Sequence, residues 1–308
     1  MELFDSQFVA EFFWLSPFWF ASEMKPGTTP KQLVGQRLVD TAAGGQHERG
    51  LYDFDKIAPS VLDFPSITQE HIDQYHEQGF LVIERAFTES QVRNIVQALE
   101  DFLSDGEYDP KSVLFEAWAD GTEAESVRKV CDFTSADSRL QKVVNDSNIL
   151  SLVSRLMHGA RPSLLQEMAL LKPAGGREKP WHQDRAYFNV EWGRPVVGTW
   201  IALDKATPEN GCMRLWTGRH RGEPFTHFQR RDWQICDRDI ERHSRVAVPL
   251  EPGGLLLFDS LLPHGTPYNP TDSRRWAVQF HYCPEDARLT DDEERMAIFG
   301  EEGKDVEC

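Results

Sequence analysis

The stretch 179-KPWHQDRAYF-188 places a histidine and a carboxylate two positions apart, directly after a proline. In an extended chain, side chains at positions i and i+2 lie on the same face, so His182 and Asp184 can close on one metal ion. The same spacing occurs in His71-Ile-Asp73, which lies in a predicted helix. There, positions i and i+2 point about 200° apart. Spacing alone does not define a site, because the backbone conformation decides whether the pair can chelate.

The chain around this stretch changes from helices to strands. The pattern Ser66-Ile-Thr-Gln69 predicts a capped helix that ends before Gly79, and strand-like residues 80–84 follow. Thr88 caps a second helix with apolar residues at a 3.6-residue period, and a third covers residues 147–158. Short apolar runs between Gly, Pro and Asn turns then predict strands at 164–171, 197–203, 213–216, 245–250, 255–258 and 275–282. This order predicts an α+β fold with a β-sandwich or jelly-roll core.

Composition limits the classes of partner. The chain has 308 residues and a net charge of −17, which argues against nucleic acid or an anionic membrane as the main partner. Five scattered cysteines form no C-x-x-C pair, which favours free thiols in a reducing compartment, and we expect a cytoplasmic protein.

The N-terminal region predicts an extension. The aromatic run 8–20, FVAEFFWLSPFWF, falls short of the roughly 20 apolar residues that a membrane span needs. It is expected to dock on the core or on a second subunit, which would make a homo-oligomer, or to act as a lid or interfacial segment. We expect an N-terminal arm at 1–65, a jelly-roll domain at 66–290 and an acidic tail at 291–308.

A third metal ligand has several candidates. His264 follows an apolar run in a Pro/Gly-rich turn, His281 lies on the last predicted strand, and three further histidines lie in an arginine-rich stretch. Two histidines and a carboxylate on a β scaffold are typical of non-haem Fe(II) oxygenases. Their usual cosubstrate, 2-oxoglutarate, needs a cation for its far carboxylate, and Arg275 begins the last strand, 11 residues after His264.

Three segments taken together resemble a known family. The pattern WHQD, then TWIALDKATPENGCMRLWTGRH, then LLPHGTPYNPTDSRRWAVQFHY is similar to the phytanoyl-CoA dioxygenase family of Fe(II)/2-oxoglutarate-dependent oxygenases, over about residues 66–285. The resemblance implies a double-stranded β-helix (jelly-roll, cupin-like) core flanked by N-terminal helices. It implies iron ligands His182, Asp184 and His264, and cosubstrate contacts from Arg275, Thr266, Trp200, Lys129 and Gln166.

Some positions depart from the family or have simpler interpretations. The family's Gly-Ser/Thr-His loop reads Gly218-Arg-His220, so a second arginine could line that rim. Arg274 is an alternative anchor beside Arg275. Trp200 could be a core residue and Lys129 an exposed strand or loop lysine. His281 is expected to be a hydrogen-bonded strand histidine.

The arginine-rich stretch 219–245 also has two interpretations. By default it is a solvated, salt-bridged loop, and its histidines, His220, His227 and His243, lie at the surface or at the substrate rim. As an insertion between strands it could also cap the pocket and meet a negatively charged substrate group.

The resemblance implies an enzyme that hydroxylates a small molecule, using Fe(II), 2-oxoglutarate and O₂ and releasing succinate and CO₂. The carboxylate of Asp184 favours hydroxylation, since related halogenases leave that position open for chloride. The alternatives are a non-catalytic jelly-roll protein and a cupin-like metalloprotein that does not use 2-oxoglutarate.

Overall fold

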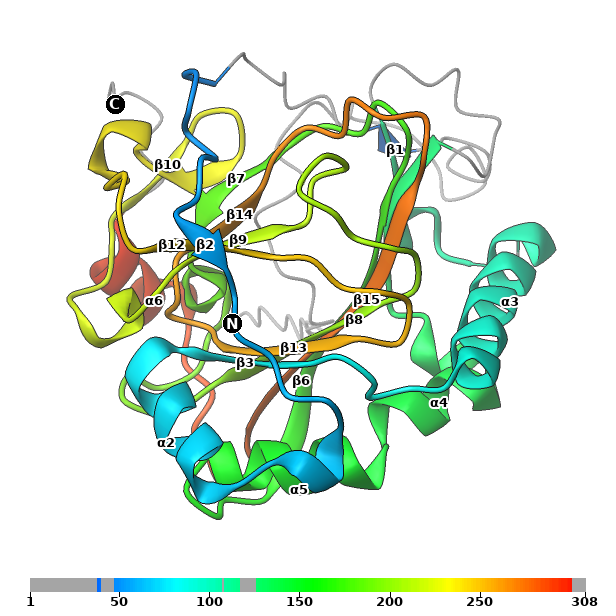
Figure 1. Ribbon diagram of the computed structural model, residues 1–308, viewed down its shortest axis with the longest axis horizontal. Helices are drawn as coiled ribbons and strands as arrows, with labels where there is room; N and C mark the ends of the chain where they lie inside the picture. The colour runs from blue at the N-terminus through cyan, green and yellow to red at the C-terminus, as the bar shows by residue number, and fades with distance from the viewer. Residues whose placement is uncertain (1–37, 40–46, 107, 117–125, 301–308) are drawn as a thin grey trace, which may run out of the picture. The chain divides into compact units, whose positions relative to one another are not determined.

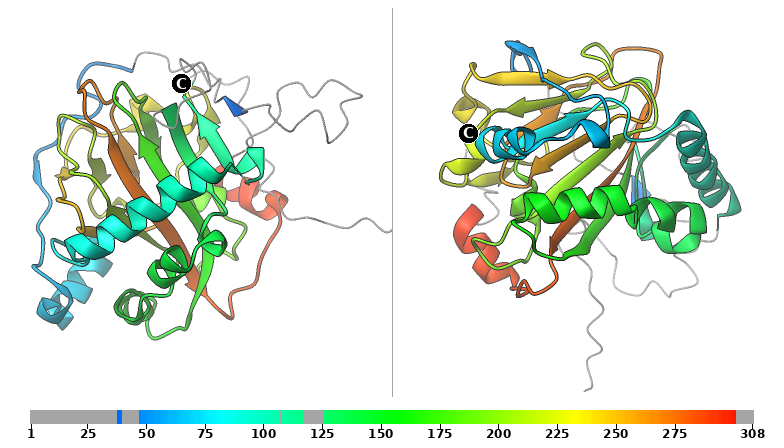
Figure 2. Two further views of the ribbon diagram at one scale, coloured as in Figure 1. Left: turned by 90° about the vertical axis from the view of Figure 1, so that its right-hand side faces the viewer. Right: turned by 60° about the horizontal axis from the view of Figure 1, so that its bottom comes forward.

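The computed structural model describes residues 38–39, 47–106, 108–116 and 126–300. Two mainly antiparallel β-sheets face one another and enclose an apolar layer, and helices cover the outer face of the larger sheet (Figures 1 and 2). This is the predicted double-stranded β-helix core with flanking helices. The aromatic run 8–20 lies outside the described residues.

The larger sheet contains β1 (Leu38–Val39), β3 (Phe80–Ile83), β4 (Val113–Phe115), β5 (Val127–Cys131), β6 (Pro162–Lys172), β8 (Val197–Ala202), β13 (Leu255–Asp259) and β15 (Arg275–Pro284). Their spatial order is β1-β4-β5-β6-β15-β8-β13-β3, and only the β1–β4 pair is parallel.

The smaller sheet contains β2 (Lys56–Ile57), β7 (Lys179–His182), β9 (Met213–Trp216), β12 (Arg245–Val248) and β14 (His264–Thr266). Their order is β2-β12-β9-β14-β7, with β7 at one edge. A separate hairpin joins β10 (His227–Gln229) to β11 (Trp233–Ile235), and β11 packs beside β7.

The α-helices are α2 (Gln69–Gln78), α3 (Glu89–Asp105), α4 (Ser138–Val144), α5 (Ser147–Leu156) and α6 (Asp292–Phe299). Short 3₁₀ turns are η2 (Phe64–Ser66), η3 (Pro110–Ser112), η5 (Thr134–Ala136), η6 (Asp184–Tyr187), η7 (Arg219–Arg221) and η8 (Asp237–Asp239). Residues 292–299, at the start of the predicted acidic tail, thus form a helix, and it packs against η6.

Strand β15 separates the two apolar layers by simple alternation. Trp276, Val278 and Phe280 join the outer layer, which includes buried residues of α3, α4 and α5. Ala277 joins the layer between the sheets. The predicted alternation of this strand is therefore confirmed, and it places Arg275, Gln279 and His281 on the inner face with Ala277.

The first helix starts later than predicted. It begins at Gln69 after the N-cap Thr68, so the predicted capping pair of Ser66 and Gln69 is wrong. Ser66 belongs instead to η2, where its N–H donates to Asp63. His71 Nδ1 accepts the N–H of Thr68 at 3.0 Å, which satisfies a backbone donor at the helix start.

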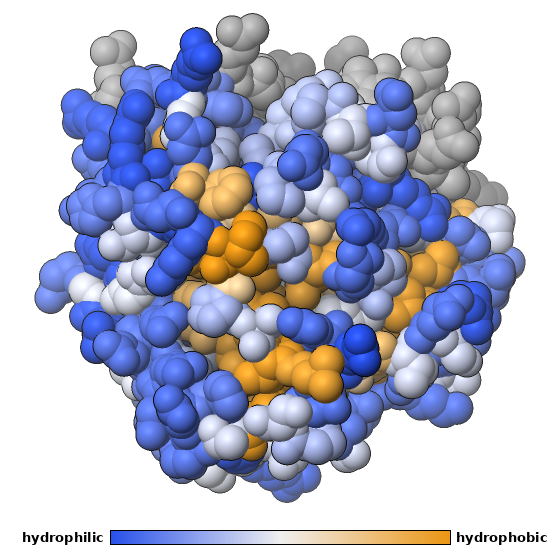
Figure 3. Space-filling model, viewed as in Figure 1, coloured by the Kyte–Doolittle hydropathy of each residue, from blue (hydrophilic) through white to orange (hydrophobic). Residues whose placement is uncertain are grey.

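Apolar groups at the surface are scattered. Ile57 and Leu62 are about half exposed near β2 and β3, where Figure 3 shows apolar surface among polar side chains. Isolated groups of this kind are usual in folded proteins. Within the described ranges, no helix combines the length and the apolar character that crossing a membrane requires.

Helix α3 supplies a direct test of the outer layer. Leu99 is fully buried, whereas Asn94 on the same helix is exposed. We expect Leu99→Ala to lower the free energy of unfolding by about 2–5 kcal/mol, because it removes buried methyl groups and leaves a cavity. Asn94→Ala should change it by less than about 0.5 kcal/mol. Urea unfolding measures both; equal midpoints would contradict this packing.

Candidate active site

The pair His182 and Asp184 is brought together by a strand that ends in a tight turn. His182 is the last residue of β7, Gln183 stays extended (φ −112°, ψ 124°), and Asp184 opens η6. Nε2 of His182 lies 3.1 Å from Oδ1 of Asp184. The extended linker thus places both side chains on one face, as the sequence predicts.

The second pair with the same spacing is not assembled. His71 Nδ1 accepts the backbone N–H of Thr68, while Asp73 accepts from the Gln69 side chain at 2.9 Å. The two side chains therefore serve separate turns of α2, as helical periodicity predicts.

His264 joins the first pair through β-sheet pairing. It begins β14, which runs antiparallel to β7, and its register partner is His182. The two imidazole rings are 4.2 Å apart, and Nε2 of His264 lies 3.5 Å from Oδ2 of Asp184. One ligand atom from each of the three buried residues lies within 4.8 Å of the others.

Backbone carbonyls set the tautomers of both histidines. Nδ1 of His182 lies 2.7 Å from the carbonyl of Pro180, and Nδ1 of His264 lies 2.9 Å from that of Leu262. A carbonyl oxygen only accepts, so each Nδ1 carries the proton and each Nε2 keeps its lone pair. Both free lone pairs thus belong to the nitrogens nearest Asp184.

The charge states suit metal binding at neutral pH. Burial acts to raise the pKa of the Asp184 carboxyl, but the imidazoles of His264 and His281 hold it well below its usual range. Burial lowers the pKa of His264 to about 4. The carboxylate is therefore ionised and this imidazole neutral, which are the forms that bind metals.

The donor set fits ferrous iron. Two imidazole nitrogens and one carboxylate, with space for further ligands, are typical of the facial triad of non-haem Fe(II) oxygenases. His182 approaches Oδ1 of Asp184 at 3.1 Å and His264 approaches Oδ2 at 3.5 Å, so each imidazole faces a different oxygen of the carboxylate.

Two side chains of β15, in the larger sheet, contact the Asp184 carboxylate. Nε2 of His281 lies 2.8 Å from Oδ2, and Nε2 of Gln279 donates to the same oxygen at 3.3 Å. Nδ1 of His281 has no partner among the described residues, so its proton sits on Nε2 and is donated to Asp184. His281 is thus a hydrogen-bonded strand histidine, as expected.

Arg275 lies on the inner face of β15, close to Trp200. It is buried, its Nη1 donates to the carbonyl of Gly211 at 2.7 Å, and its guanidinium lies 5.2 Å from the Trp200 ring. Arg275 Nε and Trp200 Nε1 are buried without a partner in the described part of the chain. The neighbouring Arg274 points outward to Asp204.

The other predicted cosubstrate residues lie on the same inner surface. Thr266 is buried on β14, two positions after His264. Gln166 on β6 pairs with His281, and Lys129 on β5 faces β6 beside Leu170. Gln166 and Lys129 are only partly buried, so this side of the inner surface is open to solvent.

Family comparison agrees with this geometry. The sequence profile of the phytanoyl-CoA dioxygenase (PhyH) family matches residues 75–277, a range that contains the three candidate ligands and Arg275. The chain belongs to this family. It is an Fe(II)- and 2-oxoglutarate-dependent dioxygenase.

Alignments with individual relatives cover about three quarters of this chain. The chain is 26% identical over 261 residues to peroxisomal phytanoyl-CoA dioxygenase of Homo sapiens, covering 75% of this chain and 72% of the relative. It is 25% identical over 232 residues to 2-aminoethylphosphonate dioxygenase of an uncultured bacterium, covering 75% and 86%. The structure of EctD from S. alaskensis with 2-oxoglutarate and 5-hydroxyectoine has a TM-score of 0.61 at 22% identity, covering 78% and 86%. That likeness establishes a shared fold.

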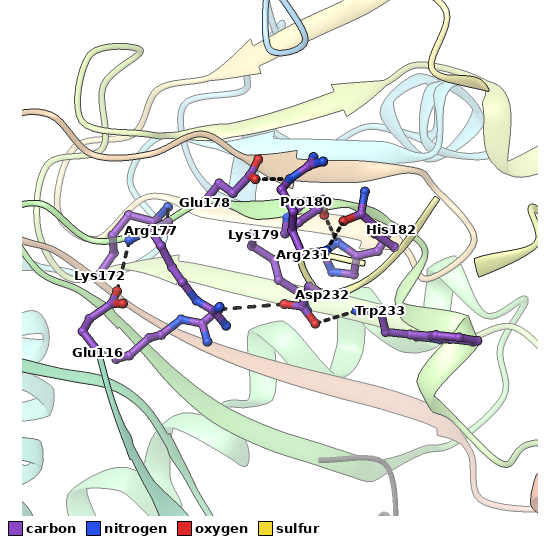
Figure 4. A network of polar contacts seen from close by, with 12 residues as sticks. Glu116, Lys172, Arg177, Glu178, Lys179, Pro180, His182, Arg231, Asp232 and Trp233 are labelled. Atoms are coloured by element: carbon purple, nitrogen blue, oxygen red, sulfur yellow. Dashed lines mark hydrogen bonds and ion pairs between the residues drawn. The ribbon is translucent and has the colours of Figure 1, made fainter. Parts of the chain in front are cut away.

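A charged network beside the metal ligands escaped the sequence interpretation (Figure 4). Lys179 Nζ lies 2.7 Å from Asp232 Oδ2 and donates to the Tyr187 hydroxyl at 3.1 Å. The Tyr187 ring packs edge-on against His182, and Arg128 reaches Asp232 from the larger sheet at 3.9 Å. Burial acts to raise the pKa of Asp232, but the charges of Lys179 and Arg128 lower it to about 2. The network therefore ties β5 to β7 beside the candidate metal ligands.

One feature of the sequence could have predicted that Arg128 faces the site. Val127 and Val130 both belong to the outer apolar layer, although simple alternation would place them on opposite faces. The β4–β5 pairing shifts register at this point, which marks a β-bulge. Two apolar residues that flank two cations in a strand are a pattern that fits such a bulge.

The arginine-rich insertion is only in part the solvated loop expected by default. His243 is exposed and lies 2.8 Å from Glu241, but His227 is fully buried, so its predicted place at the surface or rim is wrong. His220 is half-buried, with Nε2 3.2 Å from the carbonyl of His76. The hairpin β10–β11 buries His227 because β11 packs on β7.

Gly198 leaves room for the Phe258 ring, which packs against His264 and His281. It pairs with His281 on one side and Phe258 on the other. A Cβ at this position would lie 2.6 Å from the Phe258 ring, which packs 4.9 Å from the His264 ring and 6.0 Å from the His281 ring. Glycine therefore leaves the space that Phe258 occupies.

We expect Gly198→Ala to weaken metal binding about tenfold, because a displaced Phe258 ring would disturb His264 and its surroundings. Isothermal titration of the metal-free protein with Co(II) measures this. The double variant Gly198→Ala/Phe258→Leu should recover part of the loss. Unchanged affinity in a folded Gly198→Ala protein would contradict the role given to Phe258.

Acid should destabilise the metal-free protein below about pH 6.5. Burial lowers the pKa of His227 to about 3 and of His220 to about 4, from 6.5. As pH falls the unfolded chain binds these protons first, so each histidine lowers the free energy of unfolding by at most about 1.4 kcal/mol per pH unit.

Asp259 opposes this loss. Burial raises its pKa from 3.8 to about 6, so the folded state binds this proton first and gains stability as pH falls through 6. In Asp259→Asn, the free energy of unfolding should therefore fall more steeply between about pH 6 and 5 than it does in wild type. Urea unfolding at several pH values in that range gives the pH dependence of the free energy of unfolding for wild type and for Asp259→Asn. Equal slopes for the two proteins, or a wild-type protein stabilised by acid, would contradict these assignments.

Proposed function

We propose that His182, Asp184 and His264 hold Fe(II) and that the protein hydroxylates a small organic molecule. The observation that carries this is the meeting of three ligand atoms within 4.8 Å, two from the paired strands β7 and β14 and one from η6, with both Nε2 lone pairs available. Bound iron supplies O₂ activation coupled to oxidative decarboxylation of 2-oxoglutarate to succinate and CO₂. The protein supplies buried ligands in fixed geometry and the orientation of the cosubstrate.

Arg275 is the proposed anchor for the far carboxylate of 2-oxoglutarate. Burial lowers its pKa to about 10, so it stays charged at neutral pH. Its Nε and the nearby Nε1 of Trp200 are buried donors without a partner in the part of the chain described, and a carboxylate would satisfy both. Thr266, Lys129 and Gln166 are proposed as further contacts on this inner surface.

The substrate is proposed as a small molecule only. The relatives named above act on unlike molecules, phytanoyl-CoA and 2-aminoethylphosphonate, so family membership does not select between them. Asp184 supports hydroxylation, because its carboxylate fills the coordination position that a halide would need.

We also propose a cytoplasmic location and no nucleic-acid partner. The four described cysteines are all free thiols, and the net charge is −17. The domain limits 1–65, 66–290 and 291–308 remain predictions.

The pair Arg274 and Arg275 tests the cosubstrate site. Arg275→Ala should raise the dissociation constant of 2-oxoglutarate at least tenfold, because a charged, buried hydrogen-bond partner is lost. Arg274→Ala removes an equal charge at a side chain that faces Asp204 instead, and should leave this constant unchanged. Anaerobic titration of the Fe(II) protein with 2-oxoglutarate measures both. Equal effects of the two variants would contradict the assignment of Arg275 as the anchor.

The two His-x-Asp pairs test the iron site. His182→Ala and Asp184→Ala should abolish succinate formation in the presence of Fe(II), ascorbate and 2-oxoglutarate, because each removes a ligand. His71→Ala and Asp73→Ala serve as matched controls and should leave succinate formation intact. Equal activity of all four variants would overturn the ligand assignment.

A further inference from the structure

The peptide between the two ligands of the His-x-Asp motif has its own hydrogen-bond partner. The backbone N–H of Gln183 donates to Nε2 of His227 at 3.0 Å. Nδ1 of His227 in turn lies 2.9 Å from the carbonyl of Phe225 and donates to it. His227 is therefore the Nδ1–H tautomer, and its Nε2 lone pair is committed to the motif.

His227 is packed against two aromatic rings. It is fully buried, and its ring packs 5.8 Å from the ring of Trp233 and 5.8 Å from that of Phe299. Trp233 belongs to the opposite strand of the same hairpin, and Phe299 ends α6. The support behind the motif thus comes from the insertion and from a helix beyond residue 277, where the family match ends.

The same contacts reach the second ligand segment. The side chain of Gln183 accepts the N–H of Phe225 at 2.9 Å and donates to the carbonyl of Leu261 at 2.6 Å. Leu261 precedes Leu262, whose carbonyl holds Nδ1 of His264. Hydrogen bonds therefore run from the hairpin through Gln183 to the turn that carries His264.

We propose that His227 is a positioning residue for the metal centre: its Nε2 fixes the peptide between His182 and Asp184 and so preorganises the ligands before metal binds. The inference rests on the ligand set proposed above. Extended geometry at Gln183 is what places both ligands on one face, and rotation of this peptide would separate them. Partners outside the ligand set typically change metal affinity 10–100-fold when removed.

Four variants of the full-length, metal-free chain test the proposal by Co(II) titration. His227→Leu keeps the volume but removes the acceptor, and should weaken Co(II) binding about 10–100-fold. His227→Gln keeps an acceptor and should restore most of the affinity. His243→Leu changes an exposed histidine of the same insertion, and should have no effect.

Leu99→Ala separates positioning from general loss of packing. Leu99 is fully buried in the outer apolar layer, which among the described residues includes none from β7 or the hairpin, so its truncation should destabilise the fold yet leave Co(II) affinity within a few-fold of wild type. Amide exchange gives a second readout: the Gln183 N–H should lose protection in His227→Leu and keep it in His227→Gln.

The outcomes separate the two proposals. If wild type binds no Co(II), the ligand assignment fails. If wild type binds Co(II) and folded His227→Leu binds equally well, or if Leu99→Ala weakens binding as much as His227→Leu does, the positioning role of His227 is overturned.

Discussion

The antiparallel pairing of β7 with β14 is the constraint on which the site depends. It sets His264 directly opposite His182, although the two residues are far apart in the sequence. Register in a sheet with one buried face is strongly specified, because a shift by one residue would turn every side chain to the other face. The sheet thus fixes two ligands, and the extended Gln183 adds the third.

Burying the Asp184 carboxylate requires hydrogen-bond donors. His281 and Gln279 supply them from the larger sheet, whereas from the smaller sheet two Nε2 lone pairs face the carboxylate, an arrangement that a bound cation would stabilise. A buried charge without such partners would be strongly destabilising. The inner face of β15 therefore holds the carboxylate through His281 and Gln279 near one end and presents the buried Arg275 at the other.

The insertion contributes to both sheets. Its hairpin carries Asp232, which links Lys179 of β7 to Arg128 of β5, and His227, which holds the peptide of Gln183. Helix α6 packs against the same region through Phe299. Segments that composition alone would describe as a solvated loop or an acidic tail thus pack beside the candidate metal ligands. Loops held against a rigid scaffold commonly carry function.

The sequence by itself determined three helices (α2, α3 and α5) and seven strands (β3, β6, β8, β9, β12, β13 and β15). It also determined the alternation of β15 and which of two His-x-Asp pairs has both side chains on one face, because these depend on local periodicity. Spacing and family resemblance also led to the prediction of His264 as an iron ligand and of Arg275 as the cosubstrate anchor. The sequence did not place His227, Arg128 or Asp232, which owe their roles to a hairpin docking on β7 and to a bulge in β5. Those contacts join segments with no shared periodicity, so only the tertiary structure decided them.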